Sequence, residues 1–352
     1  MSYYERMKEK YAALRTKENV LILSIESSCD ETSIAIVKNG REVLANIVAS
    51  QIEIHRRFGG VVPEVASRNH ITAISNIFEE ALKVAGVDKT QIDAIAVTYG
   101  AGLMGALLVG VNFAKSLAYA LDIPLIAVSH VHGHIAANYI SHAMLEPPFV
   151  CLMVSGGHTA LLKIQDYEDF KLLGTTVDDA AGEAFDKVAR VLGLPYPGGP
   201  EIDKLALEGK NTLSFTVSNS LKNTFNFSFS GIKTSVVNYV HNAEQRGEKI
   251  NKADIACSFQ EAVTEELAEK AVRACHYAGL DKLVVAGGVG ANACLKAKLT
   301  KLCAESEIKF FAPVLKYCTD NAAMIGSAAY YMLQKGMGLA DLTLTAKPNV
   351  EL

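Results

Sequence analysis

The stretch FVCLMVSGGHTALLKI, residues 149–164, joins two apolar runs through a short polar segment that contains two glycines. Apolar runs of this length that meet at a glycine turn predict the two strands of a β-hairpin. Because glycine has no Cβ, the main-chain N–H groups at Gly156 and Gly157 can approach the oxygen atoms of a ligand closely and form an anion-binding nest. An ordinary hairpin with a glycine turn is the alternative interpretation.

The same arrangement occurs near the N-terminus, where residues 20–37, VLILSIESSCDETSIAIV, predict a strand, a small polar turn and a second strand. The two hairpins begin roughly 130 residues apart and predict two homologous lobes. Further on, apolar spacing predicts strands at 42–51, 92–98 and 125–128 and helices at 69–85 and 105–121. The resulting order β-β-β-α-β-α-β resembles a ribonuclease-H-like lobe.

The second half of the chain predicts a similar alternation of elements. It contains expected helices at 179–192, 252–278, 292–304 and 321–335, strands at 282–286 and 309–313, and a loop-rich insertion at 196–234. No linker rich in Pro, Ser or Gly separates the halves, so we expect the two lobes to share a tight hinge with a cleft between them. The expected divisions are a helical extension at 1–18, a first lobe at 19–131 completed by 322–352, and a second lobe at 132–321.

Composition is that of an ordinary soluble enzyme, because half of the 352 residues are hydrophobic and a fifth are charged. The net charge of −4 creates no global electrostatic field that attracts nucleic acid, so any RNA contact needs a local basic patch. Seven cysteines without a C-x-x-C pair indicate reduced thiols. The charged residues 1–19 cannot be a signal peptide and predict a short surface helix, favoured as a solvated appendage with a partner surface as the alternative. The apolar run 101–114 is shorter than the roughly 20 residues that cross a bilayer, so we expect a cytoplasmic protein without a membrane partner.

The segment HVHGH at 130–134 is the sharpest chemical motif. His130 and His134 are four residues apart and share one face of a helix, where they can bind a single metal, whereas His132 points away. There is no glutamate as in H-E-x-x-H, so the base of a metallopeptidase is missing. Asp320 stands where a loop begins a helix and is a plausible third ligand. Two histidines and one carboxylate are typical of iron(II) or catalytic zinc sites, and surface or capping histidines are the alternative.

Two further glycine motifs follow strands. GAGLMG at 100–105 matches G-x-G-x-x-G, but the preceding hairpin and the position of the next acid favour a tight turn over a dinucleotide site. In VVAGGVGAN, Asn292 either hydrogen-bonds a ribose or ring, or only caps its own helix. No G-x-x-x-x-G-K-[ST] sequence occurs, which excludes a P-loop ATPase.

Acidic residues accompany these turns. Asp186 is predicted to share a helix face with Asp179 and Gly182, and Asp203 follows the rigid turn PGGP. Acids beside a glycine-lined cleft suit ribose hydroxyls, and a solvated surface is the alternative. Acids in a first helical turn often only complement the helix dipole.

Together these residues resemble one family. In order, the chain contains SIESSCDETSIAIV, FGGVVPEVASRNH, LMGALLVG, HVHGH, MVSGGHTAL, DDAAGEAFDKVAR, PYPGGPEID, FSFSGIKT, GGVGAN and CTDNAAMIG. From about residue 20 to the C-terminus it is similar to the tRNA N6-adenosine threonylcarbamoyltransferases, formerly described as O-sialoglycoprotein endopeptidases. This resemblance implies an α/β protein of the actin/Hsp70/sugar-kinase-like fold, with two ribonuclease-H-like lobes around a nucleotide.

The resemblance also implies site residues. The family's metal ligands fall on His130, His134 and Asp320, with iron(II) expected and zinc as the alternative. Its contacts to ATP or an acyl-adenylate fall on Met153, Val154, Ser155, Gly156, Gly157, Asp186, Gly199, Asp203 and Asn292. Asp30 and Glu31 occupy the acidic turn near the metal as catalytic residues, with Asp30 the suggested proton acceptor. Three positions depart from the family pattern. Ala101 stands where the family usually has proline, Gly290 stands where it usually has another small residue, and His132 stands where it often has glutamate.

The implied reaction is metal-assisted acyl transfer. Threonylcarbamoyl passes from L-threonylcarbamoyladenylate to the N6 amine of the adenosine 3′ of the anticodon, in tRNAs that read codons beginning with A, and AMP leaves. Implied partners are tRNA, an inactive paralogue of the same fold and a small P-loop ATPase. Candidate tRNA contacts, with solvated charge as the alternative, are His55, Arg56, Arg57, Arg68, Lys222 and Lys233. The rival hypotheses are a small-molecule kinase of the same fold, a metallopeptidase and a non-catalytic scaffold.

Overall fold

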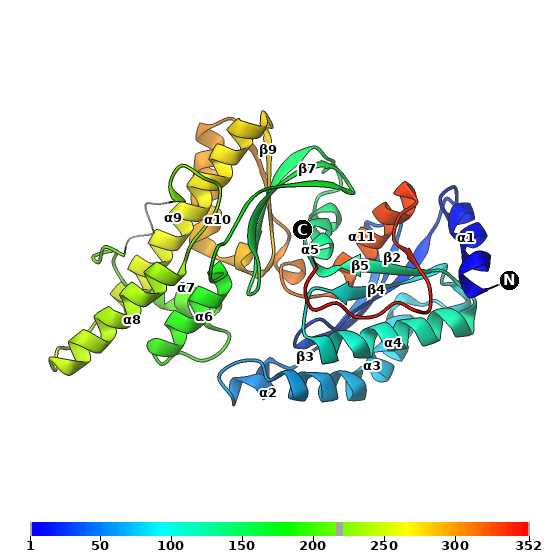
Figure 1. Cartoon of the computed structure of the whole chain (residues 1–352), viewed down its shortest axis with the longest axis horizontal. Coiled ribbons are helices and arrows are strands. Elements are labelled where there is room, and N and C mark those ends of the chain that lie inside the picture. The colour runs from blue at the N-terminus through cyan, green and yellow to red at the C-terminus, as the bar shows by residue number, and fades with distance from the viewer. Residues whose placement is uncertain (1, 216–220, 351–352) are drawn as a thin grey trace. The chain divides into compact units, whose positions relative to one another are not determined.

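Both hairpins form, and each begins a mixed β-sheet (Figure 1). The computed structural model describes residues 2–215 and 221–350. The first hairpin is β1 (Leu21–Glu26) with β2 (Glu31–Lys38), and the second is β6 (Phe149–Val154) with β7 (Thr159–Asp166). The chain separates into two compact units, Met1–Glu146 with Pro313–Leu352, here called the first unit, and Pro147–Ala312, the second unit.

The strand order of the two sheets is the same apart from one added edge strand. The first sheet runs β11-β5-β4-β1-β2-β3 and the second runs β10-β9-β6-β7-β8. In both, an antiparallel meander of three strands is extended by two parallel strands beside the first strand of the meander. The predicted duplication of one lobe is therefore confirmed.

In the first unit, helices cover the sheet. Its remaining elements are β3 (Glu42–Ser50), α2 (Ile52–Arg56), α3 (Pro63–Ala85), β4 (Ala94–Gly100), α4 (Met104–Leu121), β5 (Leu125–Ser129), α5 (His130–Ser141), α11 (Ala322–Lys335) and β11 (Leu339–Ala340). Strand β1 alternates between two buried faces, as a central strand must. Leu23 and Ile25 pack with α3 and α4, whereas the Ser24 hydroxyl donates to the carbonyl of Ala322, where α11 begins.

In the second unit, α9 (Lys252–Ala278) packs on the sheet and on the neighbouring helices. The other elements are β8 (Asp169–Thr175), α6 (Ala181–Val191), α7 (Gly198–Ala206), α8 (Ser230–Gln245), β9 (Lys282–Ala286), α10 (Ala293–Glu305) and β10 (Lys309–Phe311). The bounds of α9 and β9 are those predicted. Within the expected loop-rich insertion, α7 forms despite containing Pro200, because this residue lies in the first turn, where a missing N–H costs nothing. Strand β8 was not predicted.

The N-terminal helix α1 (Tyr3–Leu14) is not the solvated appendage that its charge predicted. Tyr3, Met7 and Tyr11 recur every four residues and are buried, because this spacing places them on one helix face. On the flanking surface, Lys10 Nζ lies 2.6 Å from the carboxylate of Asp122. The prediction was wrong because the charged residues masked the apolar stripe.

The boundaries of the two units lie after Glu146 and Ala312, not at the expected 131/132 and 321/322. Helix α5 packs closely against α11, so both stay with the first sheet. Consequently HVHGH and Asp320 belong to one unit, while the SGG turn belongs to the other.

Helix α4 is long and apolar enough, by length and composition alone, to cross a membrane. In this structure it lies against β4 and α3 and buries Ala106, Leu107, Gly110, Val111, Ala114 and Ala118. The helix extends seven residues beyond the apolar run considered in the sequence, from 114 to 121.

Candidate metal centre and glycine cradle

Two histidines and one aspartate come together in the first unit. Asp320 Oδ1 lies 3.4 Å from His130 Nε2 and 3.3 Å from His134 Nε2. All three possible ligand atoms lie within 4.8 Å of one another. Helix α5 starts at His130, directly after β5, and places His134 one turn further on. Asp320 precedes Asn321, which caps α11 by accepting a hydrogen bond from the Met324 N–H.

The three residues fit a metal ion by the chemistry of their donors. Two imidazole nitrogens and one carboxylate oxygen are the usual ligands of zinc and iron(II) in open, catalytic sites. Both histidines are nearly buried, so the donors are held by packing and not by mobile surface side chains. The sequence predicted this group of three, and the structure brings it together within one unit.

Glu26 was missed by sequence reasoning and lies directly behind this cluster. Its carboxylate is fully buried, and one oxygen lies 3.0 Å from His130 Nδ1. The same oxygen accepts a hydrogen bond from the Thr98 hydroxyl, and the other accepts one from the Ser28 N–H. A glutamate at the end of the apolar strand LILSIE was the available indication, because buried carboxylates are rare unless they are paired.

The charged groups of the cluster shift one another's pKa values. Burial by itself lowers the pKa of His130, but the carboxylates of Asp320 and Glu26 outweigh burial and hold it well above its usual value. Burial raises the pKa of Asp320, whereas His130 and His134 bring it far below its usual range. The cluster therefore favours paired charges, which is the electrostatic character of a cation site.

The acidic turn after β1 lies beside these residues. Burial, followed by the nearby charges of Asp320 and Asp30, raises the pKa of Glu31 to about 9. His70 of α3 holds this turn, with one ring nitrogen 2.9 Å from the Cys29 carbonyl oxygen and the other 2.7 Å from the Thr32 hydroxyl. Asp30 and Glu31 are therefore fixed next to the candidate metal ligands.

In the second unit, the SGG turn is contacted by two other backbone segments. Within the turn, the Ser155 N–H donates to the His158 carbonyl. From outside the turn, the Gly182 N–H at the start of α6 donates to the Ser155 carbonyl. A Cβ on Gly182 would lie 2.6 Å from that same oxygen, and one on Gly287 would lie 2.4 Å from the Val154 carbonyl. Such close backbone approaches require glycine.

Other glycines border open space. A Cβ added to Gly156, Gly157, Gly199 or Gly288 would meet no atom within 4 Å. Met153 and Val154 are buried within β6, so their side chains support the turn from below. These four glycines, beside which the space for a Cβ is free, are here called the glycine cradle (Gly156, Gly157, Gly199 and Gly288).

The acids expected to bind ligand are already hydrogen-bonded within the unit. Asp186 accepts a hydrogen bond from the Gly198 N–H at 2.7 Å and so ties α6 to α7. Asp203 accepts from the side-chain amide of Asn292 and from the Ala293 N–H, both at 3.1 Å. The structure thus brings Asp203 and Asn292 together.

Asn292 also caps α10, as the alternative interpretation held. Its Oδ1 accepts from the Leu295 N–H, and its Nδ2 donates to Gln260 as well as to Asp203. A capping role and a place in a polar network are therefore compatible.

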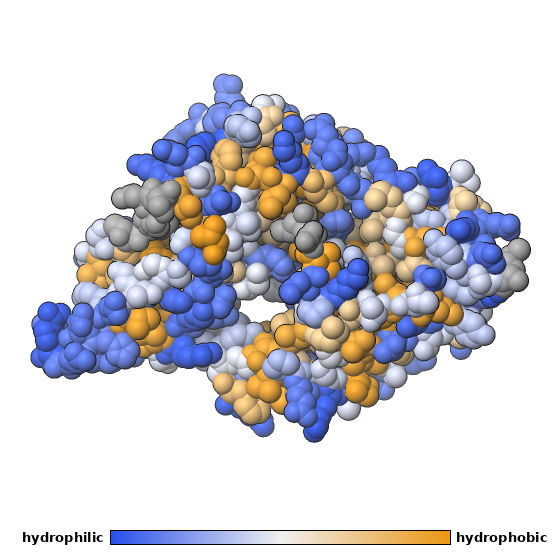
Figure 2. All heavy atoms as spheres, in the orientation of Figure 1, coloured by the Kyte–Doolittle hydropathy of each residue, from blue (hydrophilic) through white to orange (hydrophobic). Residues whose placement is uncertain are grey.

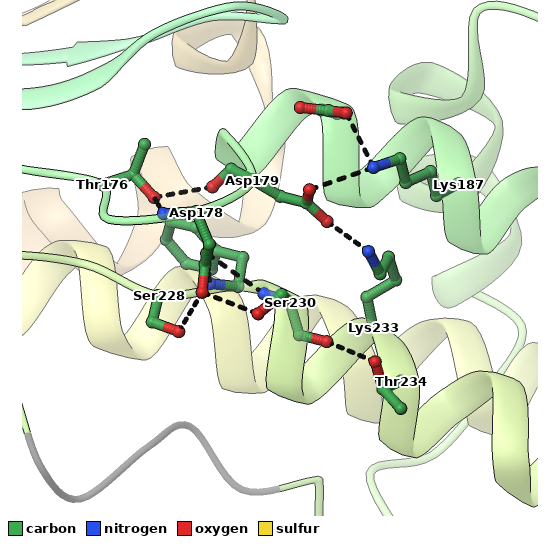
Figure 3. A network of polar contacts seen from close by, with 10 residues as sticks. Thr176, Asp178, Asp179, Lys187, Ser228, Ser230, Lys233 and Thr234 are labelled. Atoms are coloured by element: carbon green, nitrogen blue, oxygen red, sulfur yellow. Dashed lines mark hydrogen bonds and ion pairs between the residues drawn. The ribbon is translucent and has the colours of Figure 1, made fainter.

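Asp179 does not share the helix face of Gly182 and Asp186, because α6 begins only at Ala181. Asp178 and Asp179 instead lie in the preceding loop and bind α8 (Figure 3). Asp178 accepts hydrogen bonds from the hydroxyls and N–H groups at the start of α8, which has no side-chain cap of its own. Asp179 Oδ2 lies 2.6 Å from Lys233, so this candidate tRNA contact already has a partner.

The other candidate tRNA contacts divide between buried and exposed positions. His55 is fully buried and is therefore no surface contact, which corrects the prediction. Arg57 and Lys222 are exposed. Arg56 and Arg68 are exposed too, but pair with the neighbouring Glu53 and Glu64.

The duplicated sheets place the chain in the actin/Hsp70/sugar-kinase-like class of α/β proteins. Full-length HypF in its phosphate- and nucleotide-bound form is similar, with a TM-score of 0.61 and 15% identity over 90% of this chain and 46% of that chain. Component A of (R)-2-hydroxyglutaryl-CoA dehydratase from Acidaminococcus fermentans is similar with a TM-score of 0.54 and 14% identity over 90% of this chain and 99% of that chain. These similarities define the fold alone.

Sequence comparison identifies the family. The family model described as tRNA N6-adenosine threonylcarbamoyltransferase (TsaD) matches residues 42–327. Proteins of that name are 58% identical over 94% of this chain in Clostridium perfringens and 55% identical over 96% in Clostridium botulinum, covering 98% and 99% of those relatives. The chain belongs to the tRNA N6-adenosine threonylcarbamoyltransferase family, a family of transferases, and this assignment does not favour a kinase.

Proposed function

We propose that this chain transfers a threonylcarbamoyl group from L-threonylcarbamoyladenylate to the N6 amine of the adenosine 3′ of the anticodon, in tRNAs that read codons beginning with A. AMP is the leaving group. The observation that carries the proposal is the cluster of His130, His134 and Asp320 beside the acidic turn, in a chain 58% identical to a protein named for this transfer. Because the reaction needs tRNA, we place it in the cytoplasm.

His130, His134 and Asp320 would hold one divalent cation, iron(II) in our proposal and zinc as the alternative. When bound, such an ion acts as a Lewis acid that polarises the carbonyl of the acyl group and orients it. Three protein donors leave further coordination positions for substrate. The fixed arrangement of the two imidazoles and the carboxylate supports this assignment.

The adenylate would bind the second unit. The open main chain at Gly156, Gly157 and Gly199 supports contact with its phosphate, and Asp203 with Asn292 supports contact with its ribose or base. Met153, Val154 and Ser155 would contribute main-chain contacts, and Asp186 would keep α7 in place beside them. Adenine's exocyclic amine is a weak nucleophile, so positioning supplies most of the acceleration.

Asp30 would accept the proton released by the attacking amine, and Glu31 would share the acidic turn. Asp30 is nearly buried, and its main-chain oxygen accepts a hydrogen bond from the Gln51 N–H. An Asp30→Asn variant is expected to lower kcat and to change the pH–rate profile. A profile identical to that of the unmodified enzyme would remove Asp30 from this role.

Arg56 and Arg57 would contact tRNA phosphates. Charge reversal at both positions is expected to weaken tRNA binding and to reduce its salt dependence. The ion pairs that Arg56 and Arg68 make are exposed and weak, so tRNA can replace their partners at little cost. Unchanged affinity and salt slope would assign these arginines to the solvated surface.

The remaining proposed partners are an inactive paralogue of the same fold and a small P-loop ATPase. Exposed apolar side chains on α3 and α4 support the paralogue, because two helices with such faces can pack against an equivalent pair. Ile71, Val84, Met104 and Tyr119 are 44–64% exposed, and Figure 2 shows apolar surface over these helices. A co-purification with polar substitutions at Ile71 and Val84 tests this contact.

The decisive experiment measures modified nucleosides in tRNA. Depletion of this protein is expected to remove threonylcarbamoyladenosine from total tRNA as measured by mass spectrometry, and re-expression of the chain is expected to restore it. An unchanged level after depletion would contradict the proposed function. Re-expression of His134→Ala separates a requirement for the cluster from a requirement for the folded chain.

A further inference from the structure

Glu26 occupies an unusual position for a carboxylate. It is the last residue of β1, has no exposed surface and lies on the sheet face opposite the one that Leu23 and Ile25 present to α3 and α4. Alternation along the strand places it on the same face as Ser24, which contacts the start of α11. Its side chain is therefore directed toward the elements that carry the candidate metal ligands.

The two ring nitrogens of His130 face two different carboxylates. Nδ1 lies 3.0 Å from Glu26 Oε2, and Nε2 lies 3.4 Å from Asp320 Oδ1. A carboxylate can only accept a hydrogen bond, so Glu26 favours a proton on Nδ1. The lone pair of a neutral ring then resides on Nε2, toward Asp320, where a metal ligand needs it.

We propose that Glu26 is a positioning residue that fixes the orientation and tautomer of His130, so that Nε2 is the ligating nitrogen. This inference rests on the proposed metal site and adds a residue that does not touch the ion. Metal-binding histidines commonly donate their other ring N–H to a carboxylate, and the pair makes the ligand more basic and better oriented.

The surroundings of Glu26 require a carboxylate and not an amide. The Ser28 N–H donates to Oε1 at 2.6 Å, the Thr98 hydroxyl donates to Oε2 at 2.6 Å, and His130 faces Oε2 as well. Glutamine has only one acceptor oxygen, so its NH2 group would oppose either the Ser28 N–H or His130 Nδ1. The second case would force the proton of His130 onto Nε2 and block ligation.

The Ser28 hydroxyl is a second neighbour of the same nitrogen, 3.2 Å from His130 Nδ1. It can share the ring proton as an acceptor, but a hydroxyl can also donate and so cannot select a tautomer alone. His134 differs, because its buried Nδ1 has no hydrogen-bond partner among the described residues. Of the two histidines, His130 is thus the one whose Nδ1 faces a carboxylate.

The first experiment measures metal affinity in the full chain. Metal-free protein is titrated with Zn²⁺ in competition with a chromophoric chelator, for the unmodified chain and for Glu26→Gln and Glu26→Asp. Glu26→Gln is expected to weaken zinc binding about 10–100-fold, the usual effect of removing such a partner. Glu26→Asp keeps the acceptor chemistry but shortens the side chain, so its loss is expected to be smaller.

Glu266→Gln is the matched control. Glu266 pairs with the buried Lys270 at 2.5 Å in the second unit, so this variant also replaces a partly buried, paired glutamate by its amide. It is expected to leave zinc affinity unchanged. Equal affinities for the unmodified chain and Glu26→Gln would overturn the inference, as would an equal loss in the control. No zinc binding by the unmodified chain would instead refute the proposed metal site and the inference with it.

The second experiment detects the tautomer itself. In zinc-loaded protein with 15N-labelled histidine, long-range proton–nitrogen correlation spectra distinguish a protonated Nδ1 from a protonated Nε2. The His130 ring is expected to keep its proton on Nδ1, and Glu26→Gln is expected to alter this signal while that of Glu266→Gln stays unchanged. A metal-bound Nδ1 in the unmodified protein would overturn the inference. A purely structural role of Glu26 would change stability without moving this signal.

Discussion

The tips of the two hairpins differ, although they lie at equivalent positions of the same sheet order. Between β1 and β2 the turn carries acids and is held by the buried His70, and beside it lie His130 and Asp320. Between β6 and β7 the turn is glycine, with main chain open to solvent at Gly156 and Gly157. Both tips follow strands that pair with parallel neighbours, the edge where open α/β sheets usually bind ligands.

In the function proposed above, the duplicated scaffold fixes where ligands bind, while the turn residues fix which chemistry is available. Buried carboxylates and imidazoles create a site for a cation, because charge is stabilised there only by opposite charge. Turns without side chains create a site for oxygen atoms of a ligand, because main-chain N–H groups are exposed. Each of the following predictions alters one side of this comparison.

The largest expected effect is in the first unit. His134→Ala removes one of three metal donors and is expected to lower metal affinity by more than the roughly 100-fold upper range for losing an outer partner. Metal content after dialysis, measured by mass spectrometry, checks this. His276→Ala, an exposed histidine on α9, is the control. Full metal content in His134→Ala would show that the ion, if any, binds elsewhere.

In the second unit, alanine substitutions at two glycines of the SGG region are expected to change the free energy of unfolding by different amounts. Gly182→Ala places a Cβ 2.6 Å from the Ser155 carbonyl oxygen, so it is expected to lower the free energy of unfolding by about 1–3 kcal/mol. Gly156→Ala meets no atom and is expected to change it by less than about 0.5 kcal/mol. Urea unfolding measures both.

ATP binding by Gly156→Ala tests whether this glycine lies at the nucleotide site. The added methyl group of Gly156→Ala occupies the glycine cradle, so it is expected to weaken ATP binding in calorimetry even though the fold is intact. Unaltered ATP affinity in Gly156→Ala would place the nucleotide away from this turn.

Asp178 is not part of the glycine cradle, and it stabilises the second unit by capping the N-terminus of α8 from a different segment of the chain. Asp178→Ala is expected to cost roughly 1 kcal/mol of unfolding free energy, the typical value of an N-cap. Asp169→Ala, an exposed aspartate of β8, is the control and is expected to cost less. Equal stabilities of the two variants would show that the cap contributes nothing.

The contribution of Asp178 also depends on pH. Partial burial raises its pKa, but the hydrogen bonds from Ser228 and Ser230 outweigh burial and leave the pKa below the ordinary 3.8. A carboxyl whose folded pKa is lowered stabilises the protein above the unfolded value and loses this effect as pH falls through the folded value. The difference between wild type and Asp178→Ala is therefore expected to shrink below pH 3.8.

A second pH-dependent effect concerns Glu31 in the metal-free protein. Its pKa of about 9 exceeds the ordinary 4.5, so between these values the folded state binds more protons than the unfolded state. Stability therefore falls as pH rises through this window. Glu31→Gln cannot ionise and is expected to flatten this decline in thermal midpoint. A parallel decline in Glu31→Gln would exclude Glu31 as its source.

Local spacing in the sequence was sufficient for several features. It predicted both hairpins, the length of α9 and the placement of His130 and His134 on one helix face, because strand and helix periods of two and 3.6 residues fix which side chains align. The family resemblance, and not local spacing, predicted that Asp320 joins the histidines. These properties depend on residues close in the chain, or on motifs specific enough to identify relatives.

Only the tertiary structure revealed the rest. Glu26 and His130 are 104 residues apart, and Asp178 caps a helix that begins 52 residues later, so no local pattern connects them. The stripe Tyr3, Met7 and Tyr11 is buried because a surface elsewhere in the chain receives it. Spacing along the chain determines which face a side chain occupies, whereas the fold determines what that face meets, and a buried carboxylate acquires its role only from the donors packed around it.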